Sequence, residues 1–415
     1  MSGSGASARS QLALLAVVMV LGMTPWFSAT VIAPALAERW SATTAMIAWL
    51  TMAVQLGFVG GTLASAALML ADRWSARRLA AGSALLAAVA TAMVVIAADS
   101  PRTVIALRVL TGVALAGVYP PGMKIVAGWW REGRGMAIGV LVGALTLGSA
   151  SPHLLRATIG PEKWATVLLA AAACSAAAGL LLLVRVREGP FQAAPTPFDI
   201  HGLRRVIGDR GVALATGGYL GHMWELYAMW SSIGVFWGFV IARRGLDPAL
   251  GPMLAFLSIG FGLVGSVAAG VLADRIGRAT VTIVAMTVSG ACALGIGLLI
   301  DAPVVVLAMV SIVWGIAIVA DSAQFSACVT ELAPREYIGT ALTLQTSLGF
   351  LLTIITIRYV PLWAEWWGWR IAYAPLAIGP VLGIISMWRL RRSLLGSNSP
   401  VVGRSARAAA PGASR

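Results

Sequence analysis

The sequence predicts an all-α polytopic membrane protein in which twelve transmembrane helices form two pseudo-symmetric six-helix bundles. Hydrophobic residues make up 59% of the 415 and charged residues only 11%, with a mean hydropathy of +0.86. A water-soluble domain of this length needs far more polar surface. Apolar runs of about 20 residues recur along the chain, each long enough to cross a bilayer as a helix. A charged turn between two such runs occurs twice, at Asp72 and at Asp274, 202 residues apart.

Each apolar run is assigned to a helix, because a backbone with unpaired N–H and C=O groups cannot face lipid. The twelve predicted spans are 11–36, 44–70, 79–98, 102–127, 135–157, 164–185, 211–240, 249–272, 279–300, 303–328, 338–359 and 370–389. An even number of spans places both termini on the same side of the membrane.

The basic residues indicate which side that is. If both termini are cytoplasmic, only eight of the 30 Lys and Arg residues fall in outer loops, and one more, Arg108, lies within the membrane. This is the positive-inside bias of membrane proteins. We therefore expect a multi-pass protein of the cell membrane with both termini in the cytoplasm. The eight outer residues are Arg39, Arg102, Arg156, Lys163, Arg243, Arg244, Arg358 and Arg370.

A polar connector with three prolines divides the chain near its middle. We expect an N-terminal six-helix bundle over 1–187, a cytoplasmic linker over 188–210 and a C-terminal six-helix bundle over 211–392, the arrangement of a transporter built from two halves. The remainder, 393–415, is rich in Ser, Ala, Gly and Pro and carries several arginines. It is predicted to be a disordered basic cytoplasmic tail near anionic lipid.

Other function classes fit the sequence poorly. The net charge of +14 is carried by loops and by the tail, so it does not indicate nucleic-acid binding. Three cysteines, Cys174, Cys292 and Cys328, lie in apolar runs at unrelated spacings and are expected to be core residues, with no disulfide and no metal site. Three dispersed histidines and no clustered carboxylates argue against an enzyme or a cofactor. No segment is long enough for the soluble sensing domain that a receptor needs.

The repeated turn is the most specific motif. The later copy reads Gly270-Val271-Leu272-Ala273-Asp274-Arg275-Ile276-Gly277-Arg278, and the earlier copy reads Leu68-Met69-Leu70-Ala71-Asp72-Arg73-Trp74-Ser75-Ala76-Arg77-Arg78. The earlier copy keeps Asp72 and Arg73 but has Leu68 and Ser75 in place of glycines. Asp274 is expected to pair with Arg275 or Arg278, and the following glycine lets the short loop turn.

This pair of turns resembles the cytoplasmic signature of the major facilitator superfamily of secondary transporters. The resemblance covers nearly the whole chain. It implies transport by alternating access, with the turns latching the cytoplasmic side of the two halves in the outward-facing state. It assigns a cytoplasmic gate role to Asp72, Arg73, Gly270, Asp274, Arg275, Gly277 and Arg278. The earlier latch is expected to be looser or displaced by a residue.

The fourth span carries a charge within the membrane. Arg108 precedes Gly112 by four residues, which resembles the family's fourth-helix pattern. It lies about six residues, or ~9 Å, below the outer interface, a costly position unless the side chain is paired or wet. Arg108 is predicted either to hold an anionic substrate or modulate a proton site, or else to snorkel or form a structural pair. Tyr119-Pro120-Pro121 is predicted to kink the helix above the cytoplasmic gate.

The seventh span carries the candidate proton site. His222 and Glu225 are three residues apart on one helix face and are predicted to exchange a proton. A carboxylate out of water suits a group that loads and releases protons. The alternative is a structural buried pair. The residues assigned to a cavity lining are Tyr119, Trp224, Tyr227, Trp230 and Gln324.

The tenth span carries Asp321, three residues before Gln324. It lies nearer the cytoplasm, level with Lys124 of the fourth span, and a Lys124–Asp321 pair is predicted as part of the inner gate. Asp321 is alternatively a second proton site or a satisfied structural charge.

Glycine-rich stretches are expected to bring helices close together. The fifth span has Gly139, Gly143 and Gly148. The stretch Gly260-Phe261-Gly262-Leu263-Val264-Gly265 matches the dinucleotide fingerprint by letter, but it lies inside an apolar run with no strand context. Close helix packing is the better interpretation.

The sequence therefore predicts a proton-linked secondary active transporter of a small organic solute, with an organic anion preferred. The alternative is a proton-coupled multidrug-type exporter of lipophilic cations. The partners expected are the solute, protons and the lipid bilayer, with no nucleic acid, no cofactor and no metal, and we expect a monomer.

Overall fold

The structure is a computed structural model that describes residues 2–130, 134–191, 206, 208–395 and 401; the side chains of residues 2–6, 71, 72 and 134 also lie outside the description. Most of the predicted linker and tail therefore lies outside the described residues. So does the carboxylate of Asp72, one of the predicted gate residues.

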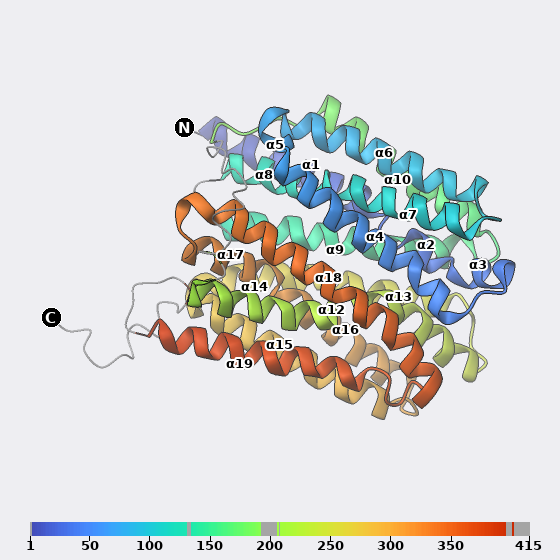
Figure 1. The fold of residues 1–415 in the computed structure, drawn as a ribbon. Helices are drawn as coiled ribbons and strands as arrows, with labels where there is room; N and C mark the ends of the chain where they lie inside the picture. Colours follow the sequence, from blue (N-terminus) through green and yellow to red (C-terminus); the bar gives the residue numbers. More distant parts are fainter. Residues whose placement is uncertain (1, 131–133, 192–205, 207, 396–400, 402–415) are drawn as a thin grey trace.

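The helices gather into two bundles that lie side by side (Figure 1). The first bundle contains α1 (Ser2–Met23), α2 (Ser28–Val31), α3 (Ala33–Trp40), α4 (Thr44–Ala67), α5 (Leu70–Arg73), α6 (Ala76–Ile96), α7 (Pro101–Ala116), α8 (Tyr119–Trp129), α9 (Arg134–Ile159) and α10 (Trp164–Val184). The second contains α12 (Arg210–Arg243), α13 (Leu250–Gly260), α14 (Gly262–Ile276), α15 (Arg278–Leu298), α16 (Val304–Ala320), α17 (Ser322–Leu332), α18 (Ile338–Trp367) and α19 (Ile378–Ser393).

Ten helices in the described part of the chain are long and apolar enough to cross a membrane, and a shorter apolar helix, Ser7–Met23, precedes them. These ten correspond to the second through eleventh predicted spans. The first predicted span is divided among α1, α2 and α3, and the last begins later than expected, with α19 preceded by a 3₁₀ turn at Ala374–Ala377. The all-helical twelve-span architecture predicted from the sequence is confirmed.

The first span is interrupted at Thr24–Phe27. Pro25 lies in the interruption and has no N–H to continue the helical ladder. The carbonyl groups before it are therefore left without their usual partners, and Trp26 and Phe27 are placed in a non-helical segment inside the protein.

Two further breaks occur at corresponding places in the two halves. The fourth span divides between α7 and α8 at Gly117 and Val118, directly before the predicted kink at Pro120 and Pro121. The tenth span divides between α16 and α17 at Asp321, within about one residue of the same place after the 202-residue shift. No proline explains the second break, but it places the Asp321 side chain at a junction between two helices.

The first and last helices identify the two ends of the molecule. α1 begins and α19 ends at the same end, where α5 and the turn between α14 and α15 also lie (Figure 1). We call this the terminal end. The opposite end carries α3 and the connection between α12 and α13, residues 244–249.

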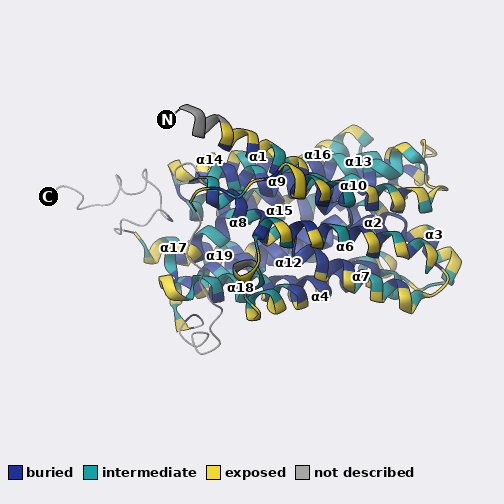
Figure 2. Ribbon diagram, turned by 90° about the horizontal axis from the view of Figure 1, so that it is seen from above, coloured by how far each residue is buried: buried dark blue, intermediate teal, exposed yellow. Residues whose placement is uncertain are grey.

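Many large apolar side chains lie exposed on the outside of the bundles. Figure 2 shows exposed residues on the outer helix faces around a buried interior. Large apolar side chains are among the most exposed, including Ile96 at 78% and Val184 at 74%. Water would penalise such a surface, whereas lipid does not.

Glycines allow close helix contacts, as the sequence predicts. A Cβ on Gly265 of α14 would lie 2.0 Å from the carbonyl oxygen of Ile316 on α16, and one on Gly315 would lie 1.6 Å from that of Ser258 on α13. Across the two bundles, Ser266 of α14 donates a 3.0 Å hydrogen bond to the Gly139 carbonyl on α9. The fingerprint-like stretch Gly260–Gly265 is therefore a helix-packing surface.

Candidate functional site

A cavity of about 530 Å³ lies between the two bundles. α8 and α9 of the first bundle line one side, and α12, α17 and α18 of the second line the other. Among the residues predicted to line a cavity, Tyr119, Tyr227, Trp230 and Gln324 do so. We call it the central cavity.

Trp224 does not line the central cavity. Its indole N–H donates a 3.1 Å hydrogen bond to the Pro375 carbonyl oxygen, on the side of α12 that faces the last span. Residues three apart on a helix are rotated by about 60° from one another, and this drift turns Trp224 away from the wall formed by Tyr227 and Trp230. The sequence stretch is aromatic throughout, so composition alone could not separate the two directions.

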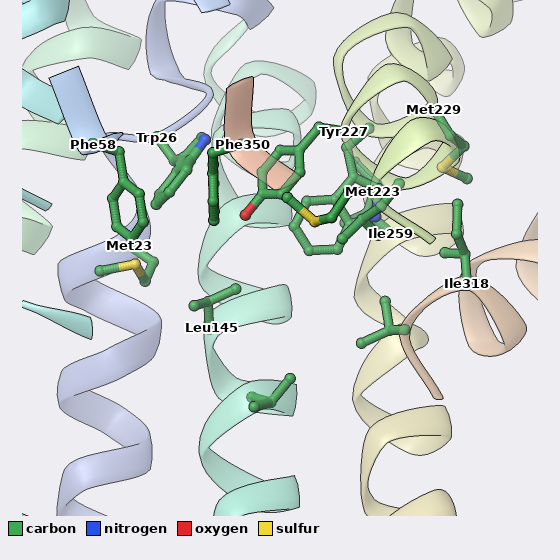
Figure 3. Packing of buried hydrophobic residues seen from close by; sticks show 14 of the residues in the cluster. Met23, Trp26, Phe58, Leu145, Met223, Tyr227, Met229, Ile259, Ile318 and Phe350 are labelled. Carbon is green, nitrogen blue, oxygen red and sulfur yellow. The ribbon is translucent and has the colours of Figure 1, made fainter. Parts of the chain in front are cut away.

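An aromatic cluster closes the central cavity on the side of the opposite end. Its members come from both bundles: Trp26 from the break after α1, Phe58 from α4, Tyr227 and Trp230 from α12, and Phe350 from α18. The Phe58 and Phe350 ring centroids are 4.5 Å apart, and Trp26 stacks on Tyr227 at 5.6 Å. Figure 3 shows Phe58, Trp26, Phe350 and Tyr227 gathered at one level, with Leu145 beyond them.

Polar contacts between the bundles reinforce this closure nearer the opposite end. Arg358 of α18 donates to the Ala45 carbonyl oxygen of α4 at 2.9 Å, and the Thr44 hydroxyl bonds the Glu365 carboxylate. None of these residues was predicted to act at a gate. Both pairs join residues more than 300 positions apart, and no pattern in the sequence predicts that they meet.

Charged side chains line the central cavity toward the terminal end. They are Lys124 of α8, Arg278 of α15 and Glu331 of α17. Arg278 donates to Glu331 at 2.7 Å through Nε and to Gln324 at 2.9 Å. The Arg278 and Glu331 side chains are 15% and 21% exposed, so solvent reaches this end of the cavity.

Both ring nitrogens of His222, on the cavity wall, have polar partners. Its Nδ1 lies 2.8 Å from Asp321 Oδ1, and its Nε2 lies 2.9 Å from the Ser322 hydroxyl. Both side chains of the His222–Asp321 pair are only 2% exposed. The break between α16 and α17 makes the pair possible, because it places Asp321 and Ser322 together at a helix junction facing α12.

The pair replaces two predicted contacts. The Asp321 carboxylate contacts His222 in place of the predicted Lys124. Glu225 does not contact His222, because the 60° offset turns it into the second bundle. There its two oxygens accept hydrogen bonds from Trp314 Nε1 at 2.6 Å and from the Ser289 hydroxyl at 2.9 Å.

Arg108 is fully buried but lies outside the central cavity. Its guanidinium donates to the carbonyl oxygens of Pro25 at 3.0 Å, of Trp26, and of Leu50 at 3.2 Å. The Pro25 and Trp26 carbonyl groups belong to the break after α1, and the Leu50 carbonyl belongs to α4. The side chain therefore fixes the segment that carries Trp26, and the predicted role of Arg108 in holding an anionic solute stays a prediction.

The later charged turn lies against the first bundle. The Asp274 carboxylate oxygens are 3.9 Å from the position that a Cβ would take on Gly135, in the first turn of α9. A helix N-terminus attracts negative charge. Gly277 has φ +89°, which a residue with a side chain rarely adopts, and Arg278 pairs with Glu331 and not with Asp274. Arg275 is exposed.

The earlier turn has a different backbone. Met69 adopts φ +50° just before α5, and Arg73 is the last residue of that short helix. A non-glycine residue in the left-handed region is strained. A looser or displaced latch at the earlier turn stays a prediction, because the Asp72 side chain lies outside the described residues.

No group of three or more His, Cys, Asp or Glu side chains that could hold a metal comes together in the part of the chain that the structure describes. His222 and Glu331 line the central cavity, and Asp321 contacts it through His222, so these three titratable side chains lie at or beside the cavity.

Comparisons with known proteins give a family and a similar solved structure for this chain. The family model described as Major Facilitator Superfamily matches residues 14–357. The chain is similar in structure to a bacterial homolog of the human lysosomal transporter Spinster, solved in an inward-facing and unoccupied conformation, with a TM-score of 0.63 and 15% sequence identity. The alignment covers 92% of this chain and 95% of that one. No curated protein matches the sequence.

Proposed function

The chain belongs to the major facilitator superfamily, and from that premise we propose that it is a proton-linked secondary active transporter of a small organic solute, with an organic anion preferred. As a member of this family it is a multi-pass membrane transporter and not an enzyme. The proposal adds the proton, the class of solute and the residues that handle each.

The central cavity is the proposed solute site. It lies between the two bundles, where alternating access exposes a site first to one side of the membrane and then to the other. The aromatic cluster closes it toward the opposite end, while partly exposed charges line it toward the terminal end. With the terminal end in the cytoplasm, as the distribution of basic residues favours, this is a cavity that faces inward.

The charges on the cavity wall support an anion. Lys124 and Arg278 carry positive charge on this wall, and Arg278 pairs with Glu331. Arginine presents several N–H groups in a planar fork that suits a carboxylate. An organic acid would therefore find its charged group recognised near Arg278 and Lys124, with its apolar part toward Tyr227 and Phe350.

The His222–Asp321 pair is the observation that carries the proton-coupling proposal. A carboxylate this deeply buried must be neutralised by a partner or by a proton. With neutral imidazole the pair has one negative charge, and with one proton added it has none. The loaded pair is therefore easier to enclose, and because His222 lines the cavity the proton can exchange while the cavity is open.

Glu225 is proposed as a supporting charge. It lies in the same bundle as the pair and is held by Trp314 and Ser289, away from the cavity wall. Because Glu225 does not line the cavity, we assign it a response to the charge state of Asp321 and no contact with the solute.

One observation favours the second candidate, export of lipophilic cations. Trp26, Tyr227, Trp230 and Phe350 present aromatic rings to the central cavity, and aromatic faces attract organic cations. In that case Glu331 would have to provide the counter-charge, since it is the carboxylate among the residues lining the cavity.

Transport assays separate these candidates. Proteoliposomes containing the protein and the dye pyranine are given an imposed pH gradient and offered monocarboxylates or ethidium. Proton movement triggered by a monocarboxylate supports the first candidate, and proton movement triggered by ethidium supports the second. Asp321→Asn should abolish pH-driven accumulation but retain exchange of labelled for unlabelled solute. If Asp321→Asn accumulates solute as well as the unaltered protein does, the pair is not the proton carrier.

A further inference from the structure

A second cavity, of about 450 Å³, lies at the opposite end between α9 of the first bundle and α12 of the second. The residues 30–34 and the connection from α12 to α13 complete its walls, and it shares no lining residue with the central cavity. Neither proton coupling nor solute binding in the central cavity uses it. We call it the peripheral cavity.

His153 of α9 lines the peripheral cavity and has no hydrogen-bond partner among the described residues. The side chain belongs to a residue that is 4% exposed, and its Nε2 is buried without a partner. Buried polar groups almost always have partners, so an orphaned imidazole indicates a ligand or solvent that completes it. An imidazole N–H is a hydrogen-bond donor in either tautomer.

Arg156 lies one helical turn further along α9 and lines the same cavity. One of its nitrogens donates to the Val31 carbonyl oxygen, which fixes the guanidinium against the segment after α2. No Asp or Glu is among the residues that line the peripheral cavity. The cavity therefore contains a buried donor and a fixed positive charge without an acidic partner.

Apart from Thr30 and Ser231, the rest of the wall is apolar, and it is partly open to the outside of the bundle. Val235 and Phe239 of α12 line the cavity and are 52% and 41% exposed. His153 is about six residues, or ~9 Å, from the end of α9, so the polar pair lies below that end while the apolar wall continues along α12. This combination suits a molecule with an anionic head and an alkyl chain.

We propose that the peripheral cavity binds the anionic head group of an amphiphile, a phosphate or carboxylate held between His153 and Arg156, with its alkyl chain along Val235 and Phe239. The head group accepts a hydrogen bond from the His153 ring and a charge-assisted bond from Arg156. This site is independent of the solute and proton sites of the central cavity.

Two glycines of α12 keep the cavity open. A Cβ on Gly234 would lie 2.6 Å from His153 Cε1, so glycine makes room for the ring. A Cβ on Gly238 would meet nothing within 4 Å, and Gly238 lines the cavity. Leucine at position 238 would therefore fill the cavity without displacing the backbone. Gly60 of α4 is a matched control, since it is also an exposed helical glycine with nothing within 4 Å and lines neither cavity.

The test measures binding of dodecyl phosphate to the full-length protein in nanodiscs of zwitterionic phosphatidylcholine. Gly238→Leu removes space for the ligand and His153→Leu removes the ring donor, so each should weaken binding about ten-fold or more. Gly60→Leu should bind as the unaltered protein does. Unchanged binding in both Gly238→Leu and His153→Leu would overturn the proposal, provided that both variants elute as monodisperse protein.

Two competitors identify the source and the charge of the ligand. Competition by inorganic phosphate points to a water-soluble anion, whereas binding that only the alkyl phosphate achieves points to a lipid of the bilayer; both outcomes support the site. Dodecyltrimethylammonium should not compete. If it displaces dodecyl phosphate at equal concentration, the cavity recognises the alkyl chain alone and the anion assignment is wrong.

Discussion

Replacing Phe350 by alanine should open the opposite end of the transporter. The Phe350 ring contacts two rings of the first bundle, Phe58 at 4.5 Å and Trp26 at 5.8 Å between centroids. Such aromatic pairs contribute about 0.5–1.5 kcal/mol each beyond the area they bury. Separation of the bundles at this end breaks both pairs, so Phe350→Ala should favour the separated state by about 1–3 kcal/mol, or about five- to 150-fold in population.

The assay is a distance measurement between spin labels at Arg102 and Trp367, which are exposed positions near the opposite end, one in each bundle. Cys174, Cys292 and Cys328 are replaced first so that labelling is specific. Phe350→Ala should increase the long-distance fraction in the distribution. If the distribution is unchanged, the aromatic cluster does not hold this end closed.

Phe236→Ala provides a matched control for lost aromatic packing. Phe236 contacts Trp237, Trp369 and Tyr373, each at 5.6 Å between centroids and all in the second bundle. Its loss should lower the thermal unfolding midpoint without changing the distance between the bundles. A long-distance shift in both variants would mean that general destabilisation, and not the cross-bundle contacts, opens the protein.

Three further predictions concern stability. Arg108→Gln removes the bonds that the guanidinium donates to the carbonyl oxygens of Pro25, Trp26 and Leu50. The Pro25 carbonyl keeps its bond from Ser28, so the loss falls mainly on the Trp26 carbonyl, at about 1–3 kcal/mol, and the thermal unfolding midpoint should fall by several degrees. An unchanged midpoint would contradict the carbonyl contacts of Arg108. Gly315→Ala should destabilise the protein strongly, because the added Cβ would lie 1.6 Å from the Ser258 carbonyl oxygen. Gly60→Ala should be tolerated, because its Cβ would meet nothing within 4 Å. Similar thermal unfolding midpoints for the two variants would refute this packing. The hydrogen bond from Arg370, with the charges of Arg243 and Arg370, holds the pKa of Asp301 below its ordinary value of 3.8. The ionised Asp301 carboxylate therefore stabilises the fold above that value, and this stabilisation is lost as the pH falls through the lowered pKa. Asp301→Asn should therefore reduce the change of the thermal unfolding midpoint with pH below about pH 4. The same pH dependence in Asp301→Asn and the unaltered protein would contradict this.

The number and order of the spans could be predicted from the sequence because lipid imposes one requirement on every span. A run such as 164–185 is apolar throughout and is bounded by charge, and α10 spans Trp164–Val184. The composition of 11–36 satisfies the length criterion for a span whether or not its helix is continuous. It therefore does not predict the break at Pro25, and α1 ends at Met23. Apolar content indicates a span but does not show where the backbone leaves the helix.

The candidate site could be predicted only in part. Periodicity placed His222 and Glu225 near each other along α12, but their partners lie on other helices: Asp321 for the first, and Ser289 and Trp314 for the second. Arg108 stands out in the sequence as a charge within the membrane, yet its partners are backbone carbonyl groups, which carry no sequence signal. Long-range pairing of this kind depends on how the two bundles pack, and a single sequence does not contain it.

The most direct test of the central claim combines the proton site with the movement of the two bundles. The Arg102–Trp367 distance distribution is recorded across pH 5 to 8 for the unaltered protein, for Asp321→Asn, and for Asp301→Asn as a control on the surface. If protonation of the His222–Asp321 pair drives alternating access, the distribution shifts with pH in the unaltered protein and in Asp301→Asn but not in Asp321→Asn. A pH-dependent shift of the same size in Asp321→Asn would contradict the account.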